Sequence, residues 1–147
     1  MKKLLIIFLL LALMILPLLS LAENLAPVDL SGPIQWDLTR LGYSMAYAQM
    51  YDMLVNPGNY LGHTVKLQGN YYTAVSEGAE ESRHLILITD TAACCEIGME
   101  FIVTGDNSAM LFPGNDTLIE LTGVFSYFEE GGYTYPVLFV NEVIPVE

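Results

Sequence analysis

Two adjacent cysteines, Cys94 and Cys95, are the residues of this sequence most open to chemistry, and they are its only cysteines. Thiolates are preferred ligands of zinc and other soft metal ions, and export from the cytoplasm would permit a disulfide. A disulfide between adjacent cysteines distorts the peptide bond between them and closes no loop. It would therefore serve a redox or binding role and would add little to the stability of the fold. In a third interpretation, one thiol packs as a small apolar side chain and the other lies in a turn. The sequence leaves all three open.

A zinc site needs about four ligands, so the cysteines would need partners. The candidates are His84, Glu96 and Glu100, which lie near the pair along the chain, whereas His63 begins a separate predicted strand and fits a surface position. The spacing is not the Cys-x-x-Cys of most structural zinc sites. It also places no histidine and orienting partner beside a nucleophilic thiol. We therefore predict a non-enzymatic binding site at Cys94, Cys95, Glu96 and Glu100, with zinc, held by Cys94, Cys95 and His84, as the candidate cofactor.

One helix is predicted before the strands that would position these residues. Over residues 44–55, apolar side chains recur at helical spacing, and Ser44 can cap the first turn. The predicted core face consists of Ala46, Met50, Met53 and Leu54. The helix should end before Pro57, because proline disfavours helical geometry in the preceding residue.

After the helix the apolar pattern changes to alternation, which indicates strands. Five are predicted, over 63–75, 84–89, 100–104, 117–128 and 133–146. Gly69 and Gly123 interrupt the two long ones, as bends do in small barrels. The fold class predicted is mainly β: a five-stranded OB-like barrel preceded by one N-terminal helix, with a five-stranded β-sandwich as the alternative. The cysteine pair would lie between the second and third strands.

The first 22 residues have the features of a secretory signal peptide. Lys2 and Lys3 precede an apolar run, Pro17 breaks that run, and small residues flank a cleavage site after Ala22. A retained membrane anchor is the alternative, because the apolar stretch almost reaches the roughly 18–20 residues of a span. We predict cleavage of residues 1–22, a flexible lead over 23–35 and one OB-like domain over 36–147. The protein would be secreted or extracytoplasmic, and membrane-associated only if the signal peptide is retained.

The chain is acidic, with 17 acidic and 5 basic residues and a net charge of −12. Cleavage would leave only Arg40, Lys66 and Arg83 as basic residues. Nucleic-acid binders neutralise phosphates with Lys and Arg, often about six to ten of them. The composition therefore excludes nucleic acid as a partner and leaves metal ions, cationic ligands and an envelope protein open.

Three runs carry a resemblance to a known family: NPGNYLGHTVKLQGNYY, ACCEIGMEF and LIELTGVFSYFEEGGYTYPVLFVNEVIPV. They resemble a bacterial family of secreted OB-like domains of unknown function with a Cys-Cys motif. That family is similar to the C-terminal domain of a permease-associated, zinc-linked membrane protein. The resemblance covers roughly residues 37–145. The matching positions are Asn56, Pro57, Tyr60, Gly62, Gly69, Cys94, Cys95, Gly98 and Gly123.

The resemblance implies an OB-like fold and no catalytic activity. The residues that follow the cysteines, Glu96 to Glu100, match the small secreted proteins rather than the zinc-linked group. Three hypotheses follow for function. The first is a binding or interaction module centred on the Cys94–Cys95 turn. The others are a zinc-binding envelope protein for metal capture or delivery, and a purely structural accessory domain of a membrane partner.

Overall fold

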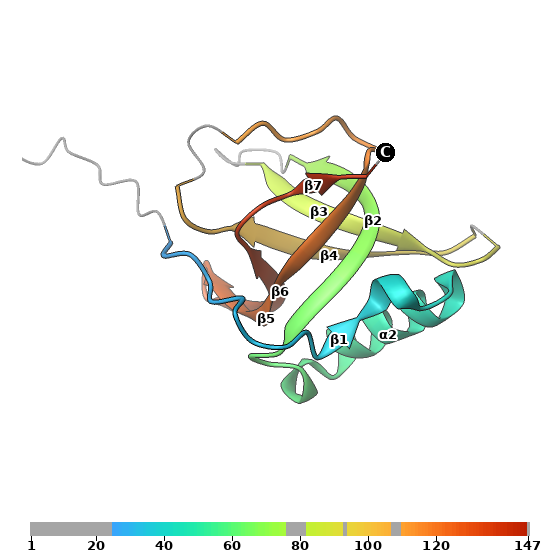
Figure 1. Ribbon diagram of the computed structural model, residues 1–147, viewed down its shortest axis with the longest axis horizontal. Coiled ribbons are helices and arrows are strands. Elements are labelled where there is room, and N and C mark those ends of the chain that lie inside the picture. Colours follow the sequence, from blue (N-terminus) through green and yellow to red (C-terminus); the bar gives the residue numbers. More distant parts are fainter. Residues whose placement is uncertain (1–24, 76–81, 93, 107–109, 147) are drawn as a thin grey trace, which may run out of the picture.

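The computed structural model describes residues 25–75, 82–92, 94–106 and 110–146 (Figure 1). The predicted signal peptide, residues 1–22, lies outside these ranges. The described residues form a mainly β fold with one α-helix, which confirms that part of the prediction. Among them, no helix combines the length and the apolar character that crossing a membrane requires.

The helix α2 spans Tyr43–Val55 between two short 3-10 turns, η2 (Leu38–Arg40) and η3 (Pro57–Asn59). The strands are β1 (Trp36–Asp37), β2 (Thr64–Ala74), β3 (Arg83–Thr89), β4 (Glu96–Val103), β5 (Leu118–Glu130), β6 (Tyr133–Val140) and β7 (Ile144–Pro145).

The strands form one seven-stranded sheet in the order β1-β2-β3-β4-β6-β5-β7, and β2 also pairs with β5. The β1–β2 and β4–β6 pairs are parallel, and the others are antiparallel. Two more strands are present than the five predicted, because the two-residue strands β1 and β7 join the sheet. The last predicted strand, 133–146, is interrupted after Val140. There Asn141 turns its amide to the backbone of Val28, with N–O distances of 2.9 Å in both directions.

The helix packs at one end of the curled sheet, against β3 and β4 (Figure 1). Its predicted face is buried at Ala46, Met50 and Met53, while Leu54 is half-buried against the same core. The predicted Ser44 cap is wrong. Gly42 precedes the first turn without a side-chain cap, and the hydroxyl of Ser44 instead forms a hydrogen bond with that of Thr91. The helix is therefore linked directly to the connection between β3 and β4.

The third predicted strand begins earlier than expected. It was expected over 100–104, but β4 starts at Glu96, directly after the cysteine pair. Gly98 lies opposite Leu87 of β3, and a Cβ at this position would lie 2.8 Å from a Leu87 methyl carbon. Glycine at this position thus lets the Leu87 side chain of β3 lie close over β4. The consequence for the site is that Cys94 and Cys95 lie at a strand end rather than inside a long loop.

Candidate functional site

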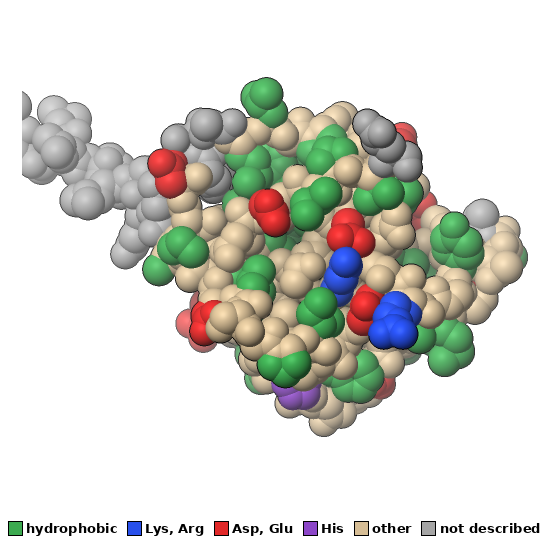
Figure 2. Space-filling model, in the orientation of Figure 1, with side chains coloured by type: hydrophobic (Ala, Val, Ile, Leu, Met, Phe, Trp, Pro, Cys, Tyr) green, Lys and Arg blue, Asp and Glu red, His purple; other side chains and the backbone are tan. Residues whose placement is uncertain are grey.

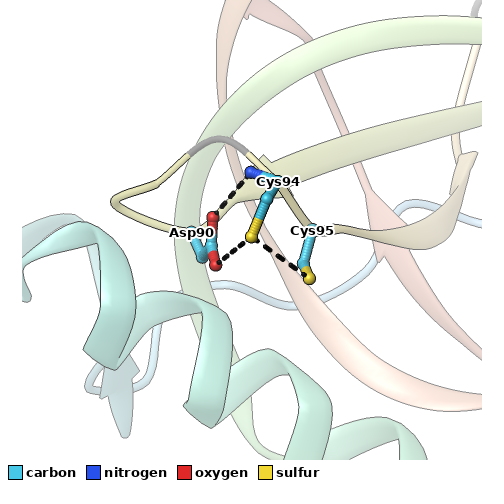
Figure 3. A group of neighbouring side chains, drawn as sticks. All are labelled: Asp90, Cys94 and Cys95. Atoms are coloured by element: carbon cyan, nitrogen blue, oxygen red, sulfur yellow. Dashed lines mark hydrogen bonds between the residues drawn. The ribbon is translucent and has the colours of Figure 1, made fainter.

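The connection between β3 and β4 is a short hairpin turn that carries both cysteines (Figure 3). The last ladder pair is Thr89 with Glu96. Beyond it, the amide of Asp90 donates to the carbonyl of Cys95 at 3.1 Å, which extends the hairpin by one more bond. The turn is therefore held at its base, and both thiols lie at the sheet end, next to α2.

Three potential ligand side chains meet on this turn. The ligand atoms of Asp90, Cys94 and Cys95 all lie within 4.8 Å of one another. The sulfurs are 3.7 Å apart, and the Cys94 sulfur lies 3.4 Å from Oδ2 of Asp90 (Figure 3). Both cysteines are exposed, free thiols. The structure thus favours an accessible dithiol over a thiol buried as core.

These separations match the edges of a zinc coordination tetrahedron. With a zinc–sulfur bond of about 2.3 Å, two ligating sulfurs are about 3.8 Å apart; with a zinc–oxygen bond of about 2.1 Å, a sulfur and an oxygen are about 3.6 Å apart. The two observed distances lie within about 0.2 Å of these values. Two of the three ligand–ligand distances therefore already suit one zinc ion, and the third, between Cys95 and Asp90, is within 4.8 Å. The fourth coordination position would be open to solvent or another ligand.

Hydrogen bonds within the turn set the protonation of its groups. The pKa of Cys94 rises to about 11, first because its thiol is hydrogen-bonded to Cys95, and then because of the hydrogen bond to Asp90 and the negative charge there. Desolvation raises the pKa of Asp90. Hydrogen bonds from the Cys94 thiol and from the amides of Cys94, Cys95 and Ala92 outweigh it and lower that pKa overall. Near neutral pH the turn therefore holds a carboxylate beside a protonated Cys94.

The predicted partners of the cysteines lie elsewhere. Glu96 is exposed at the start of β4, outside the three-ligand group. Glu100 forms an ion pair with Arg83, with 2.9 Å between a guanidinium nitrogen and a carboxylate oxygen. His84 lies near the beginning of β3, where it is paired with Phe101 of β4. The cysteines follow the other end of β3, at Thr89, and five residues of strand span about 16 Å. The prediction that His84 completes a metal site with the cysteines is wrong.

His63 also has a separate role, because its Nδ1 accepts from the indole of Trp36 at 3.1 Å. The residue that the sequence analysis missed is Asp90. A signal was present, since an aspartate that follows a strand commonly accepts backbone N–H bonds in the next turn. Asp90 does so: its Oδ1 accepts from the amide of Cys94 at 3.1 Å.

No model of a known protein family matches this chain, and no curated protein is similar to it in sequence. The resemblance to OB-like domains therefore stays a prediction.

Proposed function

We propose that this protein is an exported, non-enzymatic module that captures a zinc ion at Asp90, Cys94 and Cys95. The observation that carries the proposal is the convergence of two thiols and a carboxylate within 4.8 Å on one exposed turn. Soft thiolate ligands favour zinc and copper over magnesium or calcium.

The proposed scaffold is a five-stranded OB-like barrel. The pairing order β2-β3-β4-β6-β5 leads back to β2 through the β2–β5 ladder, and β4–β6 is its parallel pair. This order supports the proposal, because a sheet whose last strand pairs with its first is the arrangement of a barrel. The two short strands, β1 and β7, lie outside this set of five. The β3–β4 turn then lies at one rim of the barrel, next to α2.

Capture or delivery fits the open coordination better than a structural role does. Structural zinc sites are usually closed by four protein ligands, whereas this turn offers three. A fourth position at an exposed surface allows the ion to exchange with a ligand from another molecule. The raised pKa of Cys94 also argues against a nucleophilic enzyme, because the thiolate is the reactive form and is scarce near neutral pH.

The surface charge supports the proposed choice of partner. In the described residues, Lys66 is paired with Glu120 at 2.9 Å, and Arg83 is paired with Glu100 and Glu130. On the face shown in Figure 2, basic side chains lie beside acidic ones and form no continuous basic surface. An acidic protein of this kind attracts cations and repels phosphate backbones.

The test is the mass of the purified protein, measured natively and after denaturation, with chelators left out of the purification. We expect one zinc ion per chain in the native spectrum and two reduced cysteines after denaturation. The Cys94→Ser/Cys95→Ser variant should fold and bind no zinc at this turn. A native protein without an ion and with both thiols oxidised would instead identify a vicinal disulfide and reject zinc capture.

A matched pair of carboxylate variants isolates the third ligand. Asp90→Asn keeps an oxygen that can accept the Cys94 amide, but it removes the charge, and we expect zinc affinity to fall about tenfold or more. Glu96→Gln makes the same chemical change at an exposed neighbour outside the group, and affinity should stay within about threefold. Equal losses in the two variants would mean that general charge, rather than ligation by Asp90, governs zinc binding.

A further inference from the structure

A hollow of about 260 Å³ lies at the other end of β3 from the cysteines. It is bordered by the beginning of β3, the end of β4, the end of β5 and the beginning of β6, together with Phe112 from the segment before β5. It shares no residue with the cysteine turn. The hollow is therefore separate in space from the proposed zinc site.

Flat aromatic surfaces line much of this hollow. His84 and Phe112 are stacked, with ring centroids 3.9 Å apart and an interplanar angle of 8°. On the β5 and β6 side, Phe128 and Tyr135 meet edge to face at 5.9 Å. An aromatic lining of this kind favours a ligand with a flat apolar group, because such a group can stack on the rings or pack edge to face against them.

The charges in the hollow do not cancel. Arg83 donates to Glu100 at 2.9 Å and also to Glu130, so one guanidinium faces two carboxylates. Burial lowers the pKa of His84, which keeps this imidazole neutral near pH 7. The described lining therefore retains one negative charge, within a chain that is itself strongly acidic.

Arg83 also shows how a cation is held here. Its guanidinium lies 5.1 Å from the ring centroid of Tyr135, with carboxylates beside it. An aromatic face together with a carboxylate is a common arrangement for recognising organic cations. An anion would find Arg83 already neutralised by its two carboxylates, whereas a cation would meet the net negative charge of the lining.

We propose that this hollow binds a small organic monocation, an amidinium, guanidinium or amine carried on a flat apolar body. The cationic group pairs with the carboxylates of Glu100 and Glu130, and the flat body lies against the aromatic walls. The acidic chain assists by raising the local concentration of cations. The site is distinct from metal capture, because its carboxylates are accompanied by rings and a guanidinium rather than by thiols.

Three probes of one shape and different charge test the proposal. Benzamidine, benzamide and benzoate are titrated separately into the purified protein, and binding is followed by NMR. We expect benzamidine to shift the signals of Phe112 and Tyr135. It should bind about tenfold or more tightly than benzamide, because replacing a neutral hydrogen bond by a charge-assisted one raises the affinity by about this factor. Benzoate should not bind. No binding by any probe, or equal binding by all three, overturns the proposal.

Two neighbouring glutamates supply the matched variants. Glu130 lines the hollow, whereas Glu129 does not and belongs to the opposite face of β5. Glu130→Gln should weaken benzamidine binding about tenfold, and Glu129→Gln should leave it within about twofold, although both remove one charge. Equal effects would show that the cation responds only to the overall acidity of the chain. The wild-type titration decides the matter even if a variant does not fold.

Discussion

A methyl group added at Gly123 tests the curled sheet that positions both proposed sites. Gly123 lies in β5 opposite Val140 of β6. A Cβ there would lie 2.4 Å from the carbonyl oxygen of Phe139 and 2.8 Å from side-chain carbons of Leu138 and Val140. An ordinary carbon–oxygen contact is about 3.3–3.6 Å, so the shortfall is about 1 Å and is against backbone. Since β6 cannot move without disturbing its ladder, we expect Gly123→Ala to cost about 2–3 kcal/mol.

Urea unfolding followed by tryptophan fluorescence measures this cost. Trp36 is the only tryptophan, and its ring packs against Tyr60, so its emission should report unfolding. With an m-value of about 1.5 kcal/mol per M, the midpoint for Gly123→Ala should fall by about 1–2 M. The control is Gly114→Ala, where an added Cβ meets nothing within 4 Å and should be neutral or stabilising by up to about 1 kcal/mol. Equal midpoints for the two variants would refute the close approach of β5 and β6.

Two further predictions concern the helix and the aromatic stack. Met50→Ala should destabilise the fold by about 2–5 kcal/mol, because this side chain is fully buried between α2 and the sheet. Met45→Ala, at an exposed position of the same helix, should stay within about 0.5 kcal/mol in the same urea assay. Burial lowers the folded-state pKa of His84 below its unfolded value of about 6.5, so the contribution of this histidine to stability should be full above that value and should be lost as the pH falls below it. His84→Phe keeps a ring to stack on Phe112 and should flatten that decrease; an unchanged pH profile would assign it to other groups.

The fold was predictable where periodicity and burial agree. Ala46, Met50 and Met53 recur at helical spacing and are buried, so the helix was found from its pattern. The start of β4 was predicted four residues too late, at Glu100 instead of Glu96, and the missed part contains Gly98, which packs closely under Leu87. The close packing of Gly98 depends on the register between β3 and β4, and the residues near Gly98 in the sequence do not determine that register. The Ser44 cap failed for a similar reason, since the hydroxyl has a tertiary partner in Thr91.

The candidate site was predictable only in part. The cysteines were identified by their rarity and adjacency, but their partner was sought among histidines and glutamates. Strand geometry alone argued against His84, because it begins the strand that the cysteines follow, and a seven-residue strand separates its ends by about 20 Å. Asp90 was overlooked because an aspartate after a strand is so often only a turn residue. Here it acts as a turn residue and a potential ligand at once, with one oxygen on the Cys94 amide and the other on its thiol.

That double role bears on how tightly the turn can hold an ion. A site whose side chains must first be ordered loses binding free energy to that ordering, whereas a site fixed in advance does not. The β3–β4 turn is fixed at its base by the Asp90–Cys95 backbone bond and at its centre by the Asp90 carboxylate. On its flank, Thr91 is bonded to Ser44 of α2. The helix that packs beneath the sheet thus also steadies the turn that carries the thiols. The hydrogen bonds that shape the turn should therefore contribute to zinc affinity without themselves ligating the metal.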